Sequence, residues 1–221
     1  MKKIKKKYQN VLIKAFTKQY LEQSDEWTYE SEMRIVPSLI QREVKLKKDI
    51  HVLDIGCGAG HDIEYFAKYH KSVIGVDLYP HPRCLQVLKN NKNVEFKSAE
   101  FIDLKFTQNF GLILDNGCFH HQHPSEYKNY LDKIHSLMGK ESVFVLSTFN
   151  EEDRPPDQSI HQLIDHNGRI HRYFNDGELK NLLEGQNFEV FKHINIPRSL
   201  RHKSYRLYFC RQLNEKLKER V

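Results

Sequence analysis

The fold is decided around one glycine-rich stretch, Asp54-Ile55-Gly56-Cys57-Gly58-Ala59-Gly60. The stretch closes the apolar run 51–55, which predicts a buried strand, and it precedes residues 61–70, where apolar residues recur at helical spacing. Glycines at a strand-to-helix turn let the backbone approach a ligand closely and present amide groups at the start of a helix. The stretch therefore predicts a ligand site at the end of the first strand.

The same alternation of strand and helix continues after this turn. Strand-like runs are predicted at 72–77, 94–96, 111–115, 142–147, 188–196 and 205–212. Helical patterns begin near Pro82 and cover 125–138 and 176–184. Strands that alternate with helices imply crossover connections, and so an α/β fold with a doubly wound, mainly parallel seven-stranded sheet and helices on both faces.

The regions outside this alternation are predicted to be additions to a single domain. Residues 1–48 form an N-terminal helical cap, with one or two helices between 8 and 48. Residues 49–221 form the main domain, with an insertion at 151–172 whose first part, 151–169, is predicted to be a long loop. No internal repeat and no linker divide the chain.

Composition and charge exclude several classes of protein. The 221 residues are 39% apolar, without an apolar run of about 18 residues, so we expect no membrane span. The basic start lacks the apolar core of a secretion signal, which predicts a cytoplasmic protein. The four cysteines form no C-x-x-C pair, so neither a disulfide framework nor a structural zinc site is expected.

The net charge of +6 is concentrated at the two ends of the chain. Residues 1–18 carry +7 and residues 198–221 carry +6, which leaves −7 on residues 19–197. A basic groove that binds nucleic acid is expected to run through the domain that carries the site. Because the positive charge lies at the two ends of the chain instead, nucleic acid is not expected as a partner. An electrostatic contact of the basic ends with an anionic partner stays open.

The spacing of the glycines separates two classes of cofactor. Dinucleotide-binding proteins use G-x-G-x-x-G, but here His61 stands where the third glycine would be. The sequence instead reads G-x-G-x-G after an acid, which resembles the S-adenosylmethionine site of class I methyltransferases. Asp77 ends the second strand, where an acid can accept hydrogen bonds from both ribose hydroxyls.

Two further segments carry the same resemblance. The stretch Ser98-Ala99-Glu100-Phe101-Ile102-Asp103-Leu104 is similar to the family segment whose acid contacts adenine. The fourth strand and its exit, from Phe110 through Asp115 to His121, resemble a small-molecule branch that includes the tellurite-resistance and thiopurine methyltransferases. The resemblance implies a Rossmann-like methyltransferase fold with the last strand antiparallel. It also implies cofactor contacts from Asp54, Gly56, Cys57, Gly58, Gly60, Asp77, Leu78, Glu100, Phe101 and Asp115.

Histidines at the exit of the fourth strand are candidates for a general base. His121, or its neighbour His120, would lie beside the transferred methyl group in this fold, and a neutral imidazole accepts a proton near pH 7. The alternative is a histidine that only packs. Adjacent residues cannot all face one ion, so no metal is expected. His161, His166 and His171 are expected in a solvated loop, although they could line a substrate pocket.

The sequence thus predicts transfer of a methyl group from S-adenosyl-L-methionine to a small-molecule acceptor by in-line displacement. The pre-sheet segment carries Tyr20, Trp27 and Tyr29, which could close over the cofactor. Two alternatives stay open: a methyltransferase of RNA or protein, and a regulatory protein that binds the cofactor without turnover. A monomer or a homodimer is expected.

Overall fold

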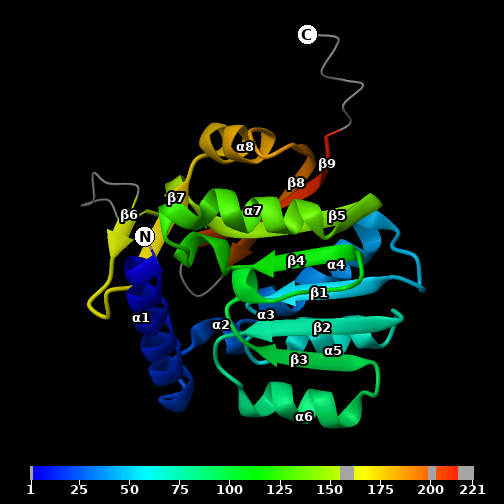
Figure 1. The fold of residues 1–221 in the computed structure, drawn as a ribbon, viewed down its shortest axis with the longest axis horizontal. Coiled ribbons are helices and arrows are strands. Elements are labelled where there is room, and N and C mark those ends of the chain that lie inside the picture. The colour runs from blue at the N-terminus through cyan, green and yellow to red at the C-terminus, as the bar shows by residue number, and fades with distance from the viewer. Residues whose placement is uncertain (1, 155–161, 199–202, 214–221) are drawn as a thin grey trace.

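The computed structural model describes residues 2–154, 162–198 and 203–213, and these build one mixed sheet with helices on both faces (Figure 1). The five central strands are parallel and follow the order β3-β2-β1-β4-β5. They are β3 (Val94–Ser98), β2 (Ser72–Asp77), β1 (His51–Ile55), β4 (Phe110–Asn116) and β5 (Met138–Asn150). All five stand where the sequence predicts strands.

The last two strands complete the predicted set of seven. β9 (Lys203–Gln212) pairs antiparallel with β5, and β8 (Phe188–Arg198) pairs antiparallel with β9. The predicted α/β fold with an antiparallel last strand is confirmed.

Alternate residues of each central strand face opposite layers of helices. Val52 of β1 packs with the layer formed by α4 (Val36–Val44), α5 (His61–Ala67) and α6 (Pro82–Asn90). Leu53 packs with the other layer, formed by α7 (Tyr127–Ser136) and α8 (Asp176–Glu184). Burial on both faces explains why the strand sequences are continuously apolar.

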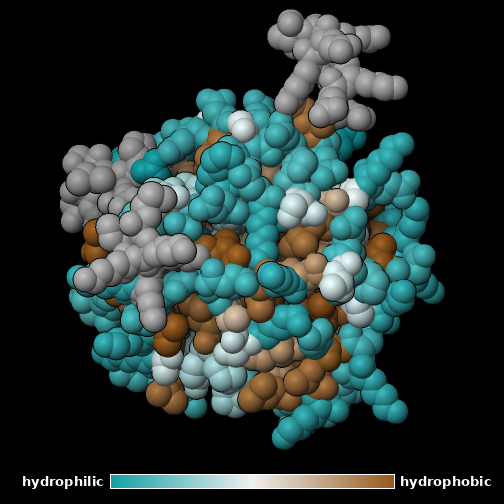
Figure 2. All heavy atoms as spheres, viewed as in Figure 1, coloured by the Kyte–Doolittle hydropathy of each residue, from teal (hydrophilic) through white to brown (hydrophobic). Residues whose placement is uncertain are grey.

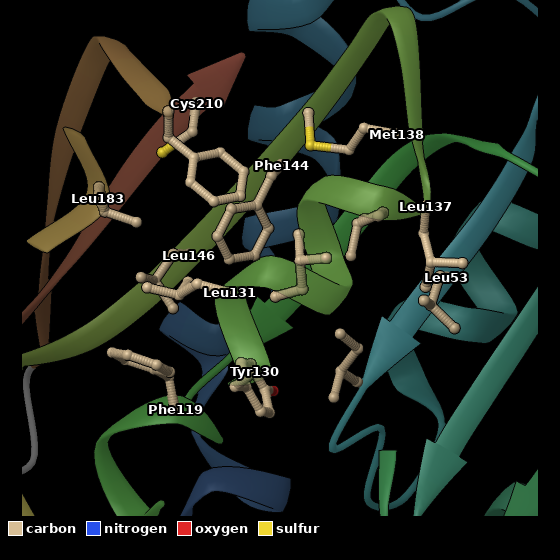
Figure 3. Packing of buried hydrophobic residues seen from close by; sticks show 14 of the residues in the cluster. Leu53, Phe119, Tyr130, Leu131, Leu137, Met138, Phe144, Leu146, Leu183 and Cys210 are labelled. Atoms are coloured by element: carbon tan, nitrogen blue, oxygen red, sulfur yellow. The ribbon is translucent and has the colours of Figure 1, made fainter. Parts of the chain in front are cut away.

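The α7 layer holds most of the large buried rings of the core. Tyr130 and Leu131 of α7 face Phe144 and Leu146 of β5, while Phe119 closes the end of the cluster (Figure 3). All five side chains are essentially inaccessible to solvent. This packing fixes the exit of β4, where η2 (Phe119–His121) begins.

The N-terminal cap contains more helices than the one or two predicted. They are α1 (Lys2–Leu21), α2 (Glu26–Tyr29), α3 (Ser31–Arg34) and α4. Gln23 has a positive φ of 53°, which ends α1, and Pro37 lies in the first turn of α4. α1 lies beside the edge at which the parallel strands end (Figure 1).

The predicted loop at 151–169 is wrong in its second half. After η4 (Glu151–Asp153), β6 (Gln162–Ile164) and β7 (Ile170–Phe174) form an antiparallel hairpin, and the end of β7 pairs with β5. Gly168 takes a positive φ of 80° at the hairpin tip. The segment His166-Asn167-Gly168, between Ile164-Asp165 and Arg169-Ile170, is a hairpin signal, because Asn and Gly tolerate the backbone angles of a tight turn.

Two short helices complete the connections: η1 (Phe101–Asp103) after β3, and η3 (Pro124–Glu126) before α7. Hydrophilic residues cover most of the face seen in Figure 2, and hydrophobic residues show in its lower half, where β2 and β3 lie in Figure 1. No described helix has the length and apolar character that a membrane crossing requires. Cys57, Cys84, Cys118 and Cys210 form no disulfide.

Candidate functional site

A cavity of about 500 Å³ opens at the carboxyl ends of β1, β2 and β4. α1 covers it from one side and the β6–β7 hairpin from another. Of the residues predicted to act, ten line the cavity: Asp54, Gly56, Cys57, Gly58, Asp77, Leu78, Glu100, Phe101, His120 and His121. Segments distant in sequence thus converge on one cavity of a size typical of small-molecule sites.

The glycine loop and the end of β2 form one wall. The amide groups of Gly56 and Cys57 donate to the carbonyl of Val76, at 2.8 and 3.1 Å. The Gly58 amide donates to Asp77 Oδ2 at 2.8 Å, and the Tyr79 amide donates to Asp77 Oδ1 at 2.9 Å. Each carboxylate oxygen has a second lone pair, so Asp77 can accept further hydrogen bonds from a diol.

Gly58 is required by its conformation and by its surroundings. Its φ is +48°, and a Cβ at this position would lie 2.8 Å from Tyr20 Oη. Tyr20 is held by Tyr79, on which it stacks at 5.3 Å, and by Trp27 and His81. Tyr20 and Trp27 both line the cavity, whereas Tyr29 is exposed and does not line it.

One end of the cavity carries buried polar atoms without partners among the described residues. Arg34 Nη2 donates to the carbonyl of Trp27, but Arg34 Nε and Nη1 have no such partner. Asn116 Nδ2 donates to Asp62 Oδ2 at 3.0 Å, while Asp62 Oδ1 and Asn116 Oδ1 are unsatisfied. A buried unsatisfied group costs about 1–3 kcal/mol. Donors and acceptors of this kind suit a ligand with a carboxylate and an ammonium group.

Acidic side chains dominate the electrostatics of this end. Burial raises the pKa of Asp54, and the neighbouring Asp62 raises it further. Burial also raises the pKa of Asp62, against the hydrogen bond from Asn116 and the charge of Arg34. A cationic ligand group next to these carboxyls would favour their ionised forms. The residues present therefore fit the methionine end of S-adenosylmethionine.

At the opposite end, Glu100 and Phe101 follow β3. Gln9 Nε2 of α1 donates to Glu100 Oε2 at 3.3 Å, and Phe101 is buried against Tyr130. The Ala99 amide donates to the backbone carbonyl of Asp77, which joins this segment to the end of β2. The arrangement offers an apolar ring and a carboxylate to a planar base.

Two predicted contacts, Gly60 and Asp115, do not line the cavity. Gly60 has a positive φ of 74° and caps the start of α5 against Cys84. Asp115 is fully buried, and its carboxylate accepts hydrogen bonds from the Cys118 and Phe119 amides and from Tyr130 Oη. Burial raises the pKa of Asp115 to about 6 although these hydrogen bonds oppose the rise. Its role here is to shape the turn that leads into η2.

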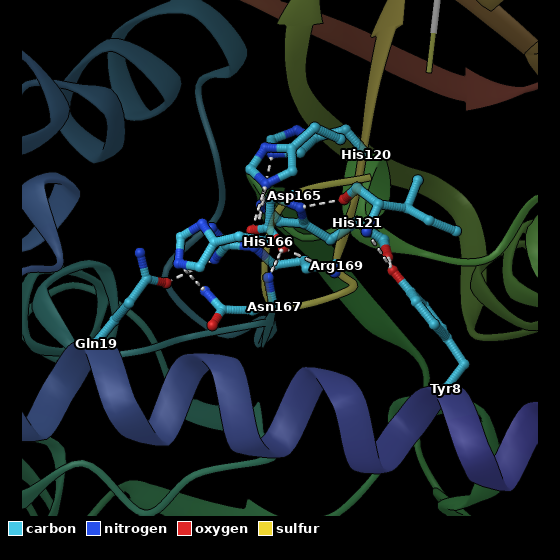
Figure 4. A network of polar contacts seen from close by, with 10 residues as sticks. Tyr8, Gln19, His120, His121, Asp165, His166, Asn167 and Arg169 are labelled. Atoms are coloured by element: carbon cyan, nitrogen blue, oxygen red, sulfur yellow. Dashed lines mark hydrogen bonds and ion pairs between the residues drawn. The ribbon is translucent and has the colours of Figure 1, made fainter. Parts of the chain in front are cut away.

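The two predicted histidines meet at the far side of the cavity (Figure 4). His121 Nδ1 lies 2.7 Å from the carbonyl oxygen of Ile170, and the Nε2 atoms of His120 and His121 are 3.1 Å apart. The ring of Phe149 stacks on His120 at a centroid distance of 3.8 Å. Burial lowers the pKa of His121 well below its ordinary value, and nearby positive charge, including that of Arg169, lowers it further.

The hairpin tip and α1 are joined directly over these histidines. Tyr8 Oη accepts a hydrogen bond from the Ile170 amide and donates one to the carbonyl of His121. Arg169 Nη1 donates to Gln19 Oε1 at 2.6 Å, and Tyr8 and Gln19 point from α1 toward this network in Figure 4. α1 and the β6–β7 hairpin together form the roof of the cavity, and these hydrogen bonds join them into a single unit.

Asp165 holds the tip of the β6–β7 hairpin together through hydrogen bonds. Its Oδ1 accepts from the amides of Asn167 and Arg169, and its Oδ2 lies 3.1 Å from Arg169 Nε and 3.2 Å from His171 Nε2. His166 and His171 line the cavity, whereas His161 lies outside the described residues. The sequence pattern missed Tyr8, Arg34, Asp165 and Arg169, since each acts through tertiary contacts that carry no local motif.

No group of three or more His, Cys, Asp or Glu side chains in the described ranges is arranged to hold a metal ion.

Comparisons with known proteins agree with this geometry. The profile of the methyltransferase-domain family matches residues 27–193. A 1,6-didemethyltoxoflavin N1-methyltransferase of Burkholderia thailandensis, solved with 1,6-didemethyltoxoflavin and S-adenosylhomocysteine, superimposes with a TM-score of 0.85. It is 30% identical, and the match covers 95% of this chain and 91% of that one.

Two further comparisons are more distant. An uncharacterized methyltransferase of Staphylococcus carnosus is 26% identical over 65% of this chain and 63% of its own length, so the chain spans less than two thirds of that relative. The N-methyltransferase NodS of Bradyrhizobium japonicum, solved with S-adenosyl-L-homocysteine, is 13% identical, with a TM-score of 0.66 over 84% of this chain and 89% of that one. This last likeness concerns the fold alone. With its fold, its glycine loop and the match over residues 27–193, the chain belongs to the class I methyltransferase family, whose cofactor is S-adenosyl-L-methionine.

Proposed function

We propose that this protein transfers the methyl group of S-adenosyl-L-methionine to a small aromatic molecule bound inside the cavity. The observation that carries the proposal is the size of the cavity together with the segments that cover it. About 500 Å³ is shared by the glycine loop and the histidine end, under a roof formed by α1 and the β6–β7 hairpin. A space of this size suits a nucleoside cofactor with a small acceptor, and not an intact macromolecule.

The chain's own residues supply the contacts that would hold the cofactor. Gly58 would let the cofactor approach the backbone closely, and Asp77 would accept hydrogen bonds from the ribose hydroxyls. Arg34 would donate to the carboxylate, and Asp62 and Asn116 would accept from the ammonium group. When bound, the cofactor supplies a methyl group already activated by a sulfonium centre. The remaining task of the protein is to align the acceptor and to exclude water.

Three aromatic rings on neighbouring strands of the sheet support an aromatic acceptor. Phe149 of β5 lies in register with Tyr173 of β7 and with Tyr205 of β9. The three rings stack in a row, with centroid distances of 5.5 and 5.7 Å and interplanar angles of 24° and 28°, and all three line the cavity. Aromatic rings contact flat aromatic ligands favourably, at about 0.5–1.5 kcal/mol per ring pair beyond the area buried.

The relative from Burkholderia supports a small acceptor. That enzyme is named as an N1-methyltransferase of 1,6-didemethyltoxoflavin, and it shares 30% identity with nearly the whole of this chain. We therefore propose a nitrogen or oxygen atom of a small aromatic compound as the methylated position.

The test uses S-adenosylmethionine with a labelled methyl group. The purified protein is incubated with three fractions of a cell extract: low-molecular-mass compounds, total RNA and total protein. We expect label in an aromatic compound of the first fraction. Label in RNA or protein would instead support a macromolecular acceptor, and tight cofactor binding without transfer would support a regulatory protein. The Asp49→Asn variant, changed at an exposed carboxylate away from the cavity, is the matched active control.

A further inference from the structure

Two arginines line different parts of the cavity. Arg34 lies at the end with the unsatisfied polar atoms, where it would meet the carboxylate of the cofactor. Arg169 lies at the tip of the β6–β7 hairpin, near the two histidines on the far side of the cavity, and its side chain is 7% exposed (Figure 4). Among the described residues, no lysine lines the cavity. In this part of the chain, the permanent positive charge on the side of the cavity left for the acceptor is therefore that of Arg169.

The hydrogen bonds of Arg169 use two of its three side-chain nitrogens. Nε lies 3.1 Å from Asp165 Oδ2 and 3.2 Å from His171 Nε2, and Nη1 donates to Gln19 Oε1 at 2.6 Å. Nη2 has no hydrogen-bond partner among the described residues. A guanidinium carries five N–H donors in one plane, so the Nη2 side of Arg169 can bind a further acceptor.

The carboxylate of Asp165 satisfies only part of this guanidinium. Its Oδ1 accepts from the Asn167 and Arg169 amides, both at 2.9 Å, and its Oδ2 faces the Nε of Arg169. Nη1 contacts the uncharged amide of Gln19. Arginine commonly binds a carboxylate through two parallel N–H groups. An anionic group on Nη2 would therefore add the charged contact that Asp165 does not supply.

The plane of the guanidinium is held by Phe16 of α1, whose ring centroid lies 4.9 Å from Arg169 Cζ. Phe16 is itself fixed by edge-to-face contacts with His121 at 5.4 Å and with Trp27 at 5.9 Å. A guanidinium that already lies over an aromatic ring loses little further freedom when it binds a ligand. Arg169 is therefore oriented before an acceptor enters.

Arg169 also lies next to the aromatic row on which the acceptor is proposed to bind. It contacts His171 through Nε, and the His171 ring is parallel to Phe149 within 7° at a centroid distance of 5.9 Å. Phe149 is the central ring of the row, between Tyr173 and Tyr205. An aromatic molecule bound on this row would thus have the guanidinium near one of its edges.

We infer that Arg169 binds the acceptor, and that the acceptor carries an anionic oxygen group, a carboxylate or an ionised hydroxyl, on its aromatic ring. The inference rests on the proposed function and narrows its substrate class. An uncharged aromatic molecule would leave a nearly buried guanidinium without this contact, so Arg169 selects against such molecules. The anionic group serves to bind and orient the acceptor, and Arg169 takes no part in the transfer of the methyl group.

Binding of two small probes to the complex with S-adenosylhomocysteine tests the inference without turnover. Benzoate carries a carboxylate on an aromatic ring, and benzyl alcohol has the same ring without the charge. We expect Arg169→Met to weaken binding of benzoate, measured by calorimetry, by at least about tenfold, because a charge-assisted contact is lost. Its affinity for benzyl alcohol should stay within about twofold. Benzoate that fails to bind the unmodified protein, or binds both proteins equally, would overturn the inference.

Arg172→Met is the matched control for the loss of an arginine from this hairpin. Arg172 of β7 pairs with Glu178 and lies over the Phe174 ring at 5.5 Å, but it does not line the cavity. This variant should bind both probes as the unmodified protein does. A loss of benzoate as large as that of Arg169→Met would show a general effect of charge and would overturn the inference.

Arg169→Lys keeps the positive charge but loses the planar set of donors. We expect its affinity for benzoate to lie between those of Arg169→Met and the unmodified protein. The melting temperature and the affinity for S-adenosylhomocysteine show whether each variant stays folded, and if Arg169→Met unfolds, Arg169→Lys decides. Equal losses of both probes in the folded variant would show that Arg169 only joins the hairpin to α1, and would overturn the inference.

The labelling experiment extends the test to the natural acceptor. The low-molecular-mass fraction is first separated on an anion-exchange resin at neutral pH, and retained and unretained compounds are assayed separately. We expect label in a compound of the retained part. With that compound, Arg169→Lys should raise KM for the acceptor at least about tenfold, while KM for S-adenosylmethionine stays within about twofold.

The outcomes separate this inference from the proposed function. Label that appears only in unretained small compounds would overturn the anionic group and leave the small aromatic acceptor standing. Label that appears only in RNA or protein would overturn the proposed function, whereas the difference between benzoate and benzyl alcohol at Arg169 would remain.

Discussion

The amide of Gly58 donates a hydrogen bond to the carboxylate of Asp77 over 2.8 Å, so the loop after β1 is tied to the end of β2. The two residues are 19 positions apart, and both line the cavity. Because a second bond to the Tyr79 amide holds the carboxylate, Asp77 is oriented before any ligand binds. Preorganisation of this kind lowers the ordering cost of binding.

Gly58→Ala tests the glycine loop. The new Cβ would lie 2.8 Å from Tyr20 Oη, and the positive φ of 48° is unfavourable for alanine. We expect affinity for S-adenosylhomocysteine, measured by calorimetry, to fall by at least about tenfold, which corresponds to about 1.4 kcal/mol. The double variant Gly58→Ala/Tyr20→Phe removes the contacting oxygen and should recover part of the loss.

Gly139→Ala is the control for this substitution. Its Cβ would make only ordinary contacts, 3.6 Å from Ser142 Oγ, and Gly139 does not line the cavity. Equal affinities of Gly58→Ala and the unmodified protein would contradict the assignment of the loop to the cofactor.

Asp77→Asn tests the ribose contact. The amide side chain keeps one acceptor oxygen, but its NH2 group then faces either the Gly58 or the Tyr79 amide. An unsatisfied buried donor costs about 1–3 kcal/mol, so we expect binding of S-adenosylhomocysteine to weaken by about tenfold or more. NAD should show no measurable binding to either form. Tight binding of NAD would be evidence for a dehydrogenase instead.

The sequence predicts the sheet well because buried parallel strands are continuously apolar and the glycine loop has a fixed place after the first of them. Asp54, Asp77 and His120, which the sequence singles out, all line the cavity. The sequence does not find Arg34, because a single arginine on a four-residue helix has no periodic signal. The β6–β7 hairpin was missed although His166-Asn167-Gly168 marks its turn, since the strands beside it are short.

Arg34→Met tests the end of the cavity that has unsatisfied polar atoms. If Arg34 Nε or Nη1 donates to the carboxylate of the cofactor, its loss removes a charge-assisted hydrogen bond worth about 1.5–3 kcal/mol. We expect S-adenosylhomocysteine to bind about tenfold more weakly or worse. Methylthioadenosine shares the nucleoside but lacks the amino-acid group, so its affinity should change by less than about twofold.

Arg42→Met, on the exposed side of α4, controls for the loss of a positive charge. Equal losses for both ligands in Arg34→Met would show that Arg34 supports the fold of the site and does not contact the carboxylate.

The last prediction concerns Asp115 and pH. Burial raises its pKa to about 6 from an ordinary value of 3.8, so the folded protein binds this proton more tightly than the unfolded chain. The resulting stabilisation is complete below pH 3.8 and is lost as the pH rises through about 6. Asp115→Asn stays neutral and removes this dependence. Relative to the unmodified protein, its free energy of unfolding should therefore rise by up to about 3 kcal/mol between pH 4 and 7.

Urea unfolding at intervals of pH measures this difference, and Asp132→Asn, at an exposed position on the same side of the sheet in α7, is the control. The absolute stability of Asp115→Asn depends also on the hydrogen bond that Tyr130 Oη donates to Asp115, which an amide NH2 group cannot accept. That contribution is independent of pH in this range, because burial keeps Tyr130 protonated. The change in the free energy of unfolding with pH, and not its value at one pH, therefore tests the prediction. Parallel curves of this free energy against pH for Asp115→Asn and the unmodified protein would contradict the raised pKa of Asp115.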